Sequence, residues 1–262
     1  MSRIVMALSV GFGLAFLIVP LAIVMPLAFN GGSYLSYPLE GLSLRWFGAV
    51  LHNPPWLAAI ANSFRVALGA TALALVVGGL AAIGTMASRR LTAIVLWALF
   101  VSPLAVPSIV MAVALYFAFA RLGLNGTYLS LVIAHALLGA PLVFVSVLNS
   151  LRGLPPELEQ AAASLGASRW MRFRTVILPL TLPGFLTGAI FAFVMSFDEV
   201  VIALFLVSPE TQTLPIALFA ALRDRLEPTL VVVALSLTLL SGLLIFALAR
   251  LRRSAAPLGK DQ

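Results

Sequence analysis

Cysteine is absent from this sequence, and charged residues are scarce. Sixteen basic and nine acidic residues serve 262 positions, so only 10% of the chain is charged whereas 62% is hydrophobic. An ordinary soluble domain is about one quarter charged. Without cysteine, the chain has neither disulfide bonds nor thiolate metal sites. With so little charge it cannot cover the surface of a water-soluble domain, and we predict that lipid surrounds most of it.

Histidine and lysine are nearly absent as well, which argues against catalysis. His52 and His135 lie far apart and do not form the His-Glu-x-x-His motif of a metalloprotease. Asp198 and Glu199 are neighbours in one segment, whereas an intramembrane aspartyl protease needs carboxylates on facing helices. The single lysine, Lys260, belongs to no phosphate-binding Gly-x-x-x-x-Gly-Lys loop. We therefore expect no catalytic residue, no metal site and no cofactor held by this chain.

Long apolar runs without a charged side chain occupy most of the sequence. Each run exceeds the roughly 20 residues that a helix needs to cross the hydrocarbon core of a membrane. This pattern predicts an all-α membrane protein with a single transmembrane domain over residues 1–262. Its six helices are expected at approximately 4–29, 64–88, 92–120, 128–150, 176–207 and 228–250.

The basic residues stand at the ends of these runs rather than on a continuous polar face, which argues against nucleic-acid binding. With six spans, both termini lie on one side of the membrane. Eleven bases then gather on that side and five on the other, so the positive-inside rule predicts cytoplasmic termini. The two groups are Arg3, Arg89, Arg90, Arg152, Arg169, Arg172, Arg174, Arg250, Arg252, Arg253 and Lys260, against Arg45, Arg65, Arg121, Arg223 and Arg225.

The segment 30–63 would then lie outside. It is rich in glycine, proline and aromatic residues, and apolar side chains gather around Trp46 and Phe47. A short helix at the membrane interface and a plain connecting loop are both compatible with this composition.

The longest inner segment, residues 152–176, contains the signals of a short helix. Pro155 and Pro156 favour a helix start, two glutamates follow in the first turn, and Gly166 stands where the helix would end. A face that is apolar and rich in small residues favours packing against a partner. Helical spacing predicts such a face, formed by Leu158, Ala161, Ala162 and Leu165.

This loop resembles the EAA motif of ATP-binding-cassette (ABC) importer permeases. The motif reads Glu-Ala-Ala, three residues, Gly, nine residues, Ile, one residue, Leu-Pro. Gln160 stands at the usual glutamate and Val176 at the usual isoleucine. Glu159 cannot take over the missing charge, because its side chain is turned by about 100° on a helix. The positions that match the motif are Ala161, Ala162, Gly166, Leu178 and Pro179.

The resemblance implies the fold of a type I ABC importer permease, with loop 152–176 as the coupling loop that docks on a cytoplasmic ATPase dimer. That dimer would bind ATP and Mg²⁺. The resemblance also implies a second permease subunit of different sequence, an external substrate-binding protein, contact with membrane lipid, and location in a bacterial inner membrane. It assigns ATPase coupling to Glu159, Gln160, Ala161, Ala162, Gly166, Leu178 and Pro179.

Other fragments are most similar to the spermidine/putrescine-type permease subunits. They are the run from Ser196 to Val201, Thr213-Leu214-Pro215, and the stretch 223–229. This similarity implies import of a small organic cation such as a polyamine. Subfamilies that import opines, aminobutyrate or aminoethylphosphonate carry similar fragments and stay open as alternatives. A secondary transporter is a further alternative, although it would usually be longer, contain an internal repeat, and give the docking helix no role.

Asp198 and Glu199 lie within or near the outer half of the membrane. A carboxylate there costs roughly 2.5 to 3.5 kcal/mol if it faces lipid, so we expect a polar cavity or a partner beside it. For a cationic substrate, this pair with the aromatic Phe197 and Tyr116 would supply ion pairing and cation–π contact. A gate or a contact between subunits is the alternative. We interpret His135 as a hydrogen-bonding residue between helices.

Overall fold

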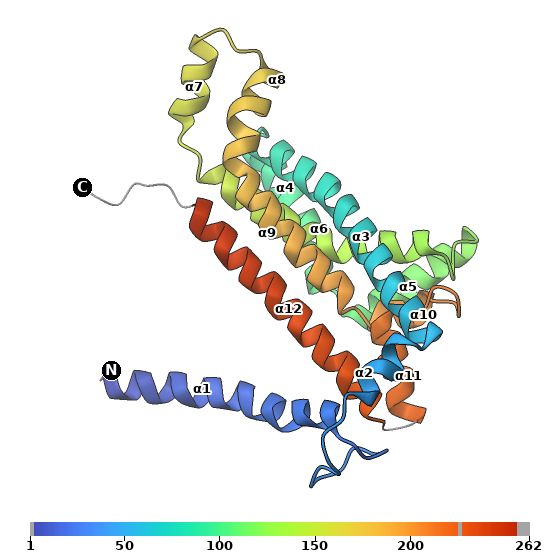
Figure 1. The fold of residues 1–262 in the computed structure, drawn as a ribbon. Coiled ribbons are helices and arrows are strands. Elements are labelled where there is room, and N and C mark those ends of the chain that lie inside the picture. Colours follow the sequence, from blue (N-terminus) through green and yellow to red (C-terminus); the bar gives the residue numbers. More distant parts are fainter. Residues whose placement is uncertain (1–2, 225–226, 256–262) are drawn as a thin grey trace. The chain divides into compact units, whose positions relative to one another are not determined.

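The computed structural model describes residues 3–224 and 227–255, and the named elements within those residues are helices (Figure 1). By its internal contacts the chain divides into two compact units. One comprises Met1–Ala58 and Ala217–Ser241, and the other comprises Ala59–Ile216 and Gly242–Gln262. The interpretation of residues 1–262 as a single transmembrane domain stays a prediction.

The first unit begins with the apolar helix α1 (Arg3–Val24), which continues as a 3₁₀ turn, Met25–Phe29. The α1 side chains from Val5 onward are exposed, as suits a helix that lipid surrounds. The unit also contains α2 (Arg45–Leu51), most of α11 (Leu214–Asp224) and the first half of α12 (Pro228–Ala255).

A polar hub holds the segment between α1 and α2 in one conformation. Asn30 is fully buried, and its Oδ1 accepts the backbone N–H of Gly32 at 3.2 Å and of Glu40 at 2.9 Å. Its Nδ2 donates to the carbonyl oxygen of Tyr34 at 3.0 Å. The indole Nε1 of Trp46 donates to the carbonyl of Asn30 at 3.0 Å. One buried amide thus satisfies the backbone groups of a loop that carries no strand pairing beyond an isolated bridge among its described residues.

Three long helices form the frame of the second unit: α3 (Pro54–Met86), α6 (Tyr128–Arg152) and α9 (Leu178–Phe197). They lie side by side (Figure 1), and glycines let their backbones approach closely. A β-carbon at Gly188 would lie 2.8 Å from the Cα of Val143, and one at Gly78 would lie 2.6 Å from the carbonyl oxygen of Ala140. Neither position has room for a side chain.

The run 92–120, which the sequence predicts as one span, consists of two helices. α4 (Arg90–Val101), a 3₁₀ turn (Ser102–Ala105) and α5 (Ser108–Arg121) turn the chain by 102°. Pro103 and Pro107 explain the break, because proline lacks an N–H and disfavours the helical conformation in the preceding residue. An apolar cavity of about 440 Å³ lies beside the bend, between side chains of α3, α4 and α6.

The expected span 176–207 is interrupted as well. α9 ends at Phe197, and the short α10 (Val201–Leu206) follows after three residues. At its other end, α9 joins α8 (Arg169–Arg172) through a π-helical segment, Phe173–Ile177. The helical backbone therefore runs without a gap from Arg169 to Phe197.

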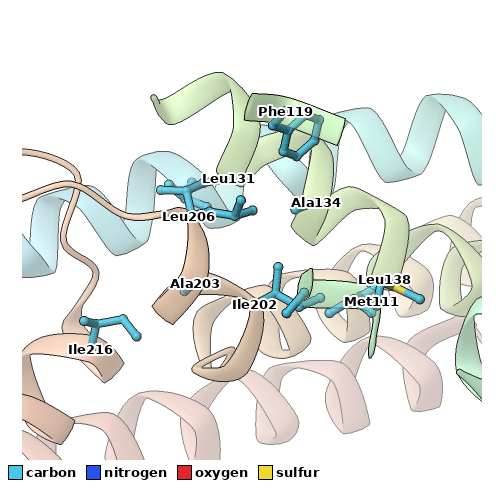
Figure 2. Close-up of a cluster of buried hydrophobic side chains, with 11 residues drawn as sticks. Met111, Phe119, Leu131, Ala134, Leu138, Ile202, Ala203, Leu206 and Ile216 are labelled. Carbon is cyan, nitrogen blue, oxygen red and sulfur yellow. The ribbon is translucent and has the colours of Figure 1, made fainter. Parts of the chain in front are cut away.

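Buried hydrophobic side chains of α5, α6 and α10 form one core of the second unit (Figure 2). Leu131 and Ala134 of α6 are fully buried in this cluster, as are Ile202, Ala203 and Leu206 of α10. The short helix α10 is thereby fastened to α5 and α6.

Within the described residues, four helices are long and apolar enough to cross a membrane, and the bent α4–α5 pair makes a fifth if it counts as one span. The four begin at Val5, Pro54, Tyr128 and Arg169. α12, with 28 residues, occupies the position of the expected span 228–250. The helical architecture agrees with the fold class expected from the apolar runs.

Candidate functional site

The loop after α6 contains a helix where the sequence predicts one. α7 (Pro156–Ser164) follows Pro155, and Glu157 and Glu159 lie in its first turn. A proline at the first helical position loses no hydrogen bond, since the first N–H groups of a helix have no intrahelical acceptor. The two carboxylates are favoured there by the positive end of the helix dipole. Local sequence signals therefore account for the start of α7.

A Schellman motif ends this helix. Gly166 has a φ of +81°, and its N–H donates to the carbonyl of Ala163 at 2.9 Å. The N–H of Ala167 donates to the carbonyl of Ala162 at 3.1 Å, which completes the motif. Glycine adopts this left-handed conformation without the steric cost that a β-carbon brings. Gly166 thus determines where α7 stops and the chain reverses.

The return arm of the loop is α8, and it is tied to α7 by an ion pair. The Oγ of Ser168 caps α8 by accepting the N–H of Met171 at 3.3 Å. At the end of the same turn, the Nη1 of Arg172 lies 3.1 Å from the Oε1 of Glu159 on α7. The two arms of the loop are therefore joined by side chains as well as by backbone.

The tip of the loop presents apolar side chains to its surroundings. Leu165 is 88% exposed and Trp170 is 68% exposed, and the indole of Trp170 stacks on Phe173 with ring centroids 5.7 Å apart. Gln160 and Ala161 are exposed too, whereas Ala162 is half-buried. An exposed apolar surface of this kind is typical of a protein interface.

Leu178 and Pro179 lie at the base of the loop, in the first turn of α9. Leu178 is half-buried and Pro179 is exposed. Because Pro179 has no N–H to donate, one backbone hydrogen bond of the continuous helix is missing there, and the π-helical segment lies directly before it. The residues expected to couple to an ATPase thus divide between the tip, from Glu159 to Gly166, and the base.

The two carboxylates of the acidic pair have different surroundings. Glu199 is buried, and its Oε1 accepts the backbone N–H of Ile202 at 2.7 Å. This bond satisfies one of the free N–H groups at the start of α10, which is the role of a helix cap. Asp198 follows directly on the last residue of α9 and is exposed. Of the two, Asp198 is the carboxylate open to a ligand.

The two aromatic pathway candidates also differ. Phe197 is buried, with its ring packed against Phe64 and Phe193 at centroid distances of 5.0 and 5.3 Å. Tyr116 lies on α5, and its ring is exposed beside Phe117. Phe197 therefore belongs to an aromatic cluster between α3 and α9, whereas Tyr116 is accessible.

His135 makes the contact that its isolated position in an apolar span suggests. It is buried on α6, and its Nδ1 lies 2.8 Å from the Oγ of Ser196 on α9. A hydrogen bond between helices satisfies polar groups that lipid cannot. The interpretation of His135 as a helix-packing residue is confirmed, and the contact holds the end of α9 just before Asp198.

A polar cluster that sequence reasoning missed lies between the first half of α3, the start of α6 and the α10–α11 loop. The Nδ2 of buried Asn62 donates to the carbonyls of Glu210 and Gln212 at 2.9 and 3.0 Å. The hydroxyl of Tyr128 donates to the Oδ1 of Asn62 at 2.7 Å, and Arg65 donates to the same oxygen at 3.2 Å. An asparagine just before a long apolar run was the one available signal.

Comparison with known proteins identifies relatives of this chain. Residues 74–254 match the family model described as binding-protein-dependent transport system inner membrane component. The chain is 33% identical over 239 residues to the spermidine/putrescine transport system permease protein PotC of Haemophilus influenzae, a match that covers 88% of this chain and 92% of the relative. The PotC protein of Escherichia coli K12 is 30% identical over 234 residues, with 89% and 88% covered.

A relative named for a different substrate is similar to a comparable degree. The putative 2-aminoethylphosphonate transport system permease protein PhnV of Salmonella typhimurium is 30% identical over 237 residues. The match covers 88% of this chain and 89% of that protein.

Solved structures of ABC transporters share the fold. A chain of a bacterial ABC transporter involved in the import of the acidic polysaccharide alginate superposes with a TM-score of 0.70 at 17% identity, covering 98% of this chain and 99% of that one. A chain of the inward-facing MetNI methionine ABC transporter gives 0.61 at 20% identity, covering 80% and 98%. At these identities the likeness shows the fold alone. It confirms the expected all-α architecture of an ABC importer permease.

Proposed function

Because this chain belongs to the family of binding-protein-dependent transport system inner membrane components, we propose that it lines the path of an ATP-driven importer for a small organic cation such as a polyamine. Permease subunits of this kind are non-catalytic, and a partner subunit hydrolyses ATP. The observation that carries the choice of substrate is the 33% identity to a spermidine/putrescine permease over most of both chains.

A second permease subunit of different sequence would complete the path, and an external binding protein would deliver the substrate. Closure of the ATPase dimer on ATP would then switch the pair of permeases between outward-open and inward-open states. Both termini would lie on the cytoplasmic side, in agreement with the distribution of basic residues.

Loop 152–176 is the proposed contact with the ATPase. Its support is threefold: the match to the EAA pattern, the helix α7 that ends at Gly166, and the exposed apolar tip around Leu165. Burial of an exposed leucine against a partner contributes roughly 1.5 to 3 kcal/mol, so the tip can supply much of the docking affinity.

Leu165→Asp tests this contact, because it places a charge where the partner would bury an apolar side chain. We expect the amount of ATPase that co-purifies with the permease to fall by about tenfold or more. Leu42→Asp is the matched control, since Leu42 is 81% exposed on the segment between α1 and α2. Equal recovery of ATPase with both variants would show that the tip is not the docking site.

Asp198 is the proposed partner of the substrate cation. It is an exposed carboxylate at the end of α9, whereas the neighbouring Glu199 is engaged as the cap of α10. Removing one member of a desolvated charge pair costs roughly 2 to 5 kcal/mol, so Asp198→Asn should lower uptake of radiolabelled putrescine about thirtyfold or more. Glu199→Gln keeps a capping oxygen and should retain most uptake. Near-normal uptake by the Asp198 variant would reject the cation site.

Import of 2-aminoethylphosphonate is the second candidate, favoured by the 30% identity to PhnV over similar coverage. That substrate carries an anionic phosphonate beside its amine, so an exposed aspartate would repel one end of it. Uptake of both compounds by the native chain and by Asp198→Asn separates the two. A polyamine importer takes up putrescine and loses that uptake on neutralisation, whereas a phosphonate importer takes up 2-aminoethylphosphonate in preference to putrescine.

A further inference from the structure

Glu159 and Arg172 lie on opposite arms of loop 152–176. Glu159 is on α7 and Arg172 ends α8, and their Oε1 and Nη1 atoms are 3.1 Å apart. Between them the chain passes through the Schellman turn at Gly166 and the cap at Ser168. The ion pair therefore joins the two arms between residues that are thirteen positions apart in the sequence.

Burial distinguishes this pair from an ordinary surface ion pair. The side chain of Arg172 is only 20% exposed, whereas that of Glu159 is 53% exposed. An arginine held by packing has already lost most of its conformational freedom, so little further entropy is lost when it binds a carboxylate. Arg172 directly precedes the π-helical segment, so it belongs to the continuous helical backbone that leads into α9.

Neither the residue at the usual motif glutamate nor the glutamate before it offers an unpaired carboxylate at the tip of the loop. Gln160, which stands at the glutamate of the EAA pattern, is neutral and exposed. Glu159 next to it is engaged by Arg172. Two large apolar side chains of the tip, Leu165 and Trp170, are exposed.

We propose that Glu159 and Arg172 are positioning residues that brace the coupling loop from within, so that α7 moves together with α8 and α9 while the apolar tip contacts the ATPase. This rests on the proposed function of the loop. Without the brace, α7 is joined to α8 through the turn at residues 165–168, and it can pivot about Gly166 when the ATPase pushes on it. Movement of the ATPase would then be passed to α9 less completely.

The test uses the full transporter in liposomes, with ATPase, second permease and external binding protein present. Two quantities are measured for each variant: the amount of ATPase retained on the complex, and the putrescine imported per ATP hydrolysed. The variants are Glu159→Arg, Arg172→Glu and the double exchange of both. Glu157→Gln, a charge removal in the first turn of the same helix, is the control.

We expect each single reversal to lower putrescine imported per ATP about two- to fivefold, the range that a partly exposed ion pair supports. The double exchange should recover most of the native ratio, since it restores the pair with its ends reversed. All three variants should retain the ATPase, because the docking affinity is proposed to come from the apolar tip around Leu165 and not from this ion pair.

Three results would overturn the proposal. The double exchange could be as poorly coupled as the single reversals, or Arg172→Glu could leave the ratio unchanged, and in both cases the pair would not act as a brace. Loss of ATPase with Glu159→Arg that the second reversal does not repair would show that Glu159 contacts the ATPase directly. Failure of the proposed docking site would be detected by a different measurement. In that case Leu165→Asp would retain as much ATPase as the control Leu42→Asp.

Discussion

At the scale of single residues, the acidic pair shows how a helix end separates two neighbouring carboxylates. α9 stops at Phe197 and α10 begins at Val201, so the first N–H groups of α10 need acceptors. Glu199 is within reach of the N–H of Ile202 and takes that place. Asp198, one residue earlier, is left exposed. The direction of each side chain follows from the break in the helix.

Glu199→Ala should therefore destabilise the protein through loss of the cap on α10. Removal of a capping oxygen typically costs about 1 kcal/mol, within a range of roughly 0.5 to 2 kcal/mol. Glu199→Gln keeps an oxygen that can accept the N–H of Ile202 and should lose less. Thermal unfolding of the two variants in detergent provides the measurement. Equal melting temperatures for both would show that the hydrogen bond to Ile202 contributes nothing.

Gly166 offers a second prediction at this scale. Its φ is +81°, and a β-carbon built there meets nothing within 4 Å, so the cost of Gly166→Ala is conformational. A left-handed conformation costs an alanine roughly 1 to 2 kcal/mol, and the turn that ends α7 should weaken. We expect faster proteolysis of the loop with unchanged thermal stability of the spans. Gly84→Ala, where φ is not positive and nothing lies within 4 Å, is the control.

Residue-scale features were predictable from the sequence where their cause is local. The proline start and the glycine stop of α7 depend on backbone conformation at one position, which the residue type determines. The hub at Asn30 and the cluster at Asn62 depend on carbonyls that are brought close only by the folded chain. An isolated asparagine does not reveal such acceptors, so both were missed.

At the scale of helices, close packing of α6 against α9 is the main contact of the second unit. Gly184 and Gly188 are four residues apart on α9, and Ala192 continues the same row of small residues. A β-carbon at Gly184 would lie 2.5 Å from the Cβ of Ser150 on α6. Rows of this kind allow helix backbones to approach and to gain dispersion contacts where lipid gives no hydrophobic driving force.

Gly188→Ala should separate these two helices. Its new β-carbon would lie 2.8 Å from the Cα of Val143, a backbone atom that cannot move aside alone. Overpacking of this kind typically lowers the free energy of unfolding by about 1 to 3 kcal/mol. We therefore expect a lower midpoint of unfolding in denaturing detergent. Gly13→Ala on α1, where nothing lies within 4 Å, should be neutral. A neutral effect at Gly188 would contradict the close approach.

The bend between α4 and α5 marks the limit of prediction for helices. Several prolines stand inside the expected spans, Pro103, Pro107, Pro141 and Pro183 among them, and a proline can kink a helix. Pro103 and Pro107 lie at the 102° bend, whereas Pro141 lies inside an unbroken α6. The residue type permits a break, and packing of the neighbouring helices decides whether one occurs.

At the scale of the whole molecule, the long apolar runs were sufficient to predict a helical membrane protein. Burial of backbone groups in lipid requires helices, and length alone then places most of the spans. The division into two units and the interruption after Phe197 were not predictable, because they depend on contacts between distant segments.

Membrane orientation supplies the prediction at this scale. The chain contains no cysteine, so single cysteines can be introduced at His52 and Arg169, both of which are exposed. With eleven bases on one side and five on the other, an impermeant thiol reagent added outside intact cells should label position 52 and leave position 169 unlabelled. The opposite labelling pattern would reverse the topology and place loop 152–176 outside.

The unbroken helical backbone from Arg169 to Phe197 has a mechanical consequence. Its 29 residues correspond to a rod roughly 43 Å long, with the ion-paired loop at one end and Asp198 at the other. If the rod turns as one piece, a rotation of only about 5° about the loop end moves Asp198 by about 4 Å, which exceeds the length of a hydrogen bond. Under the proposed function, a small tilt at the loop end would thus be enough to release a substrate cation from that carboxylate.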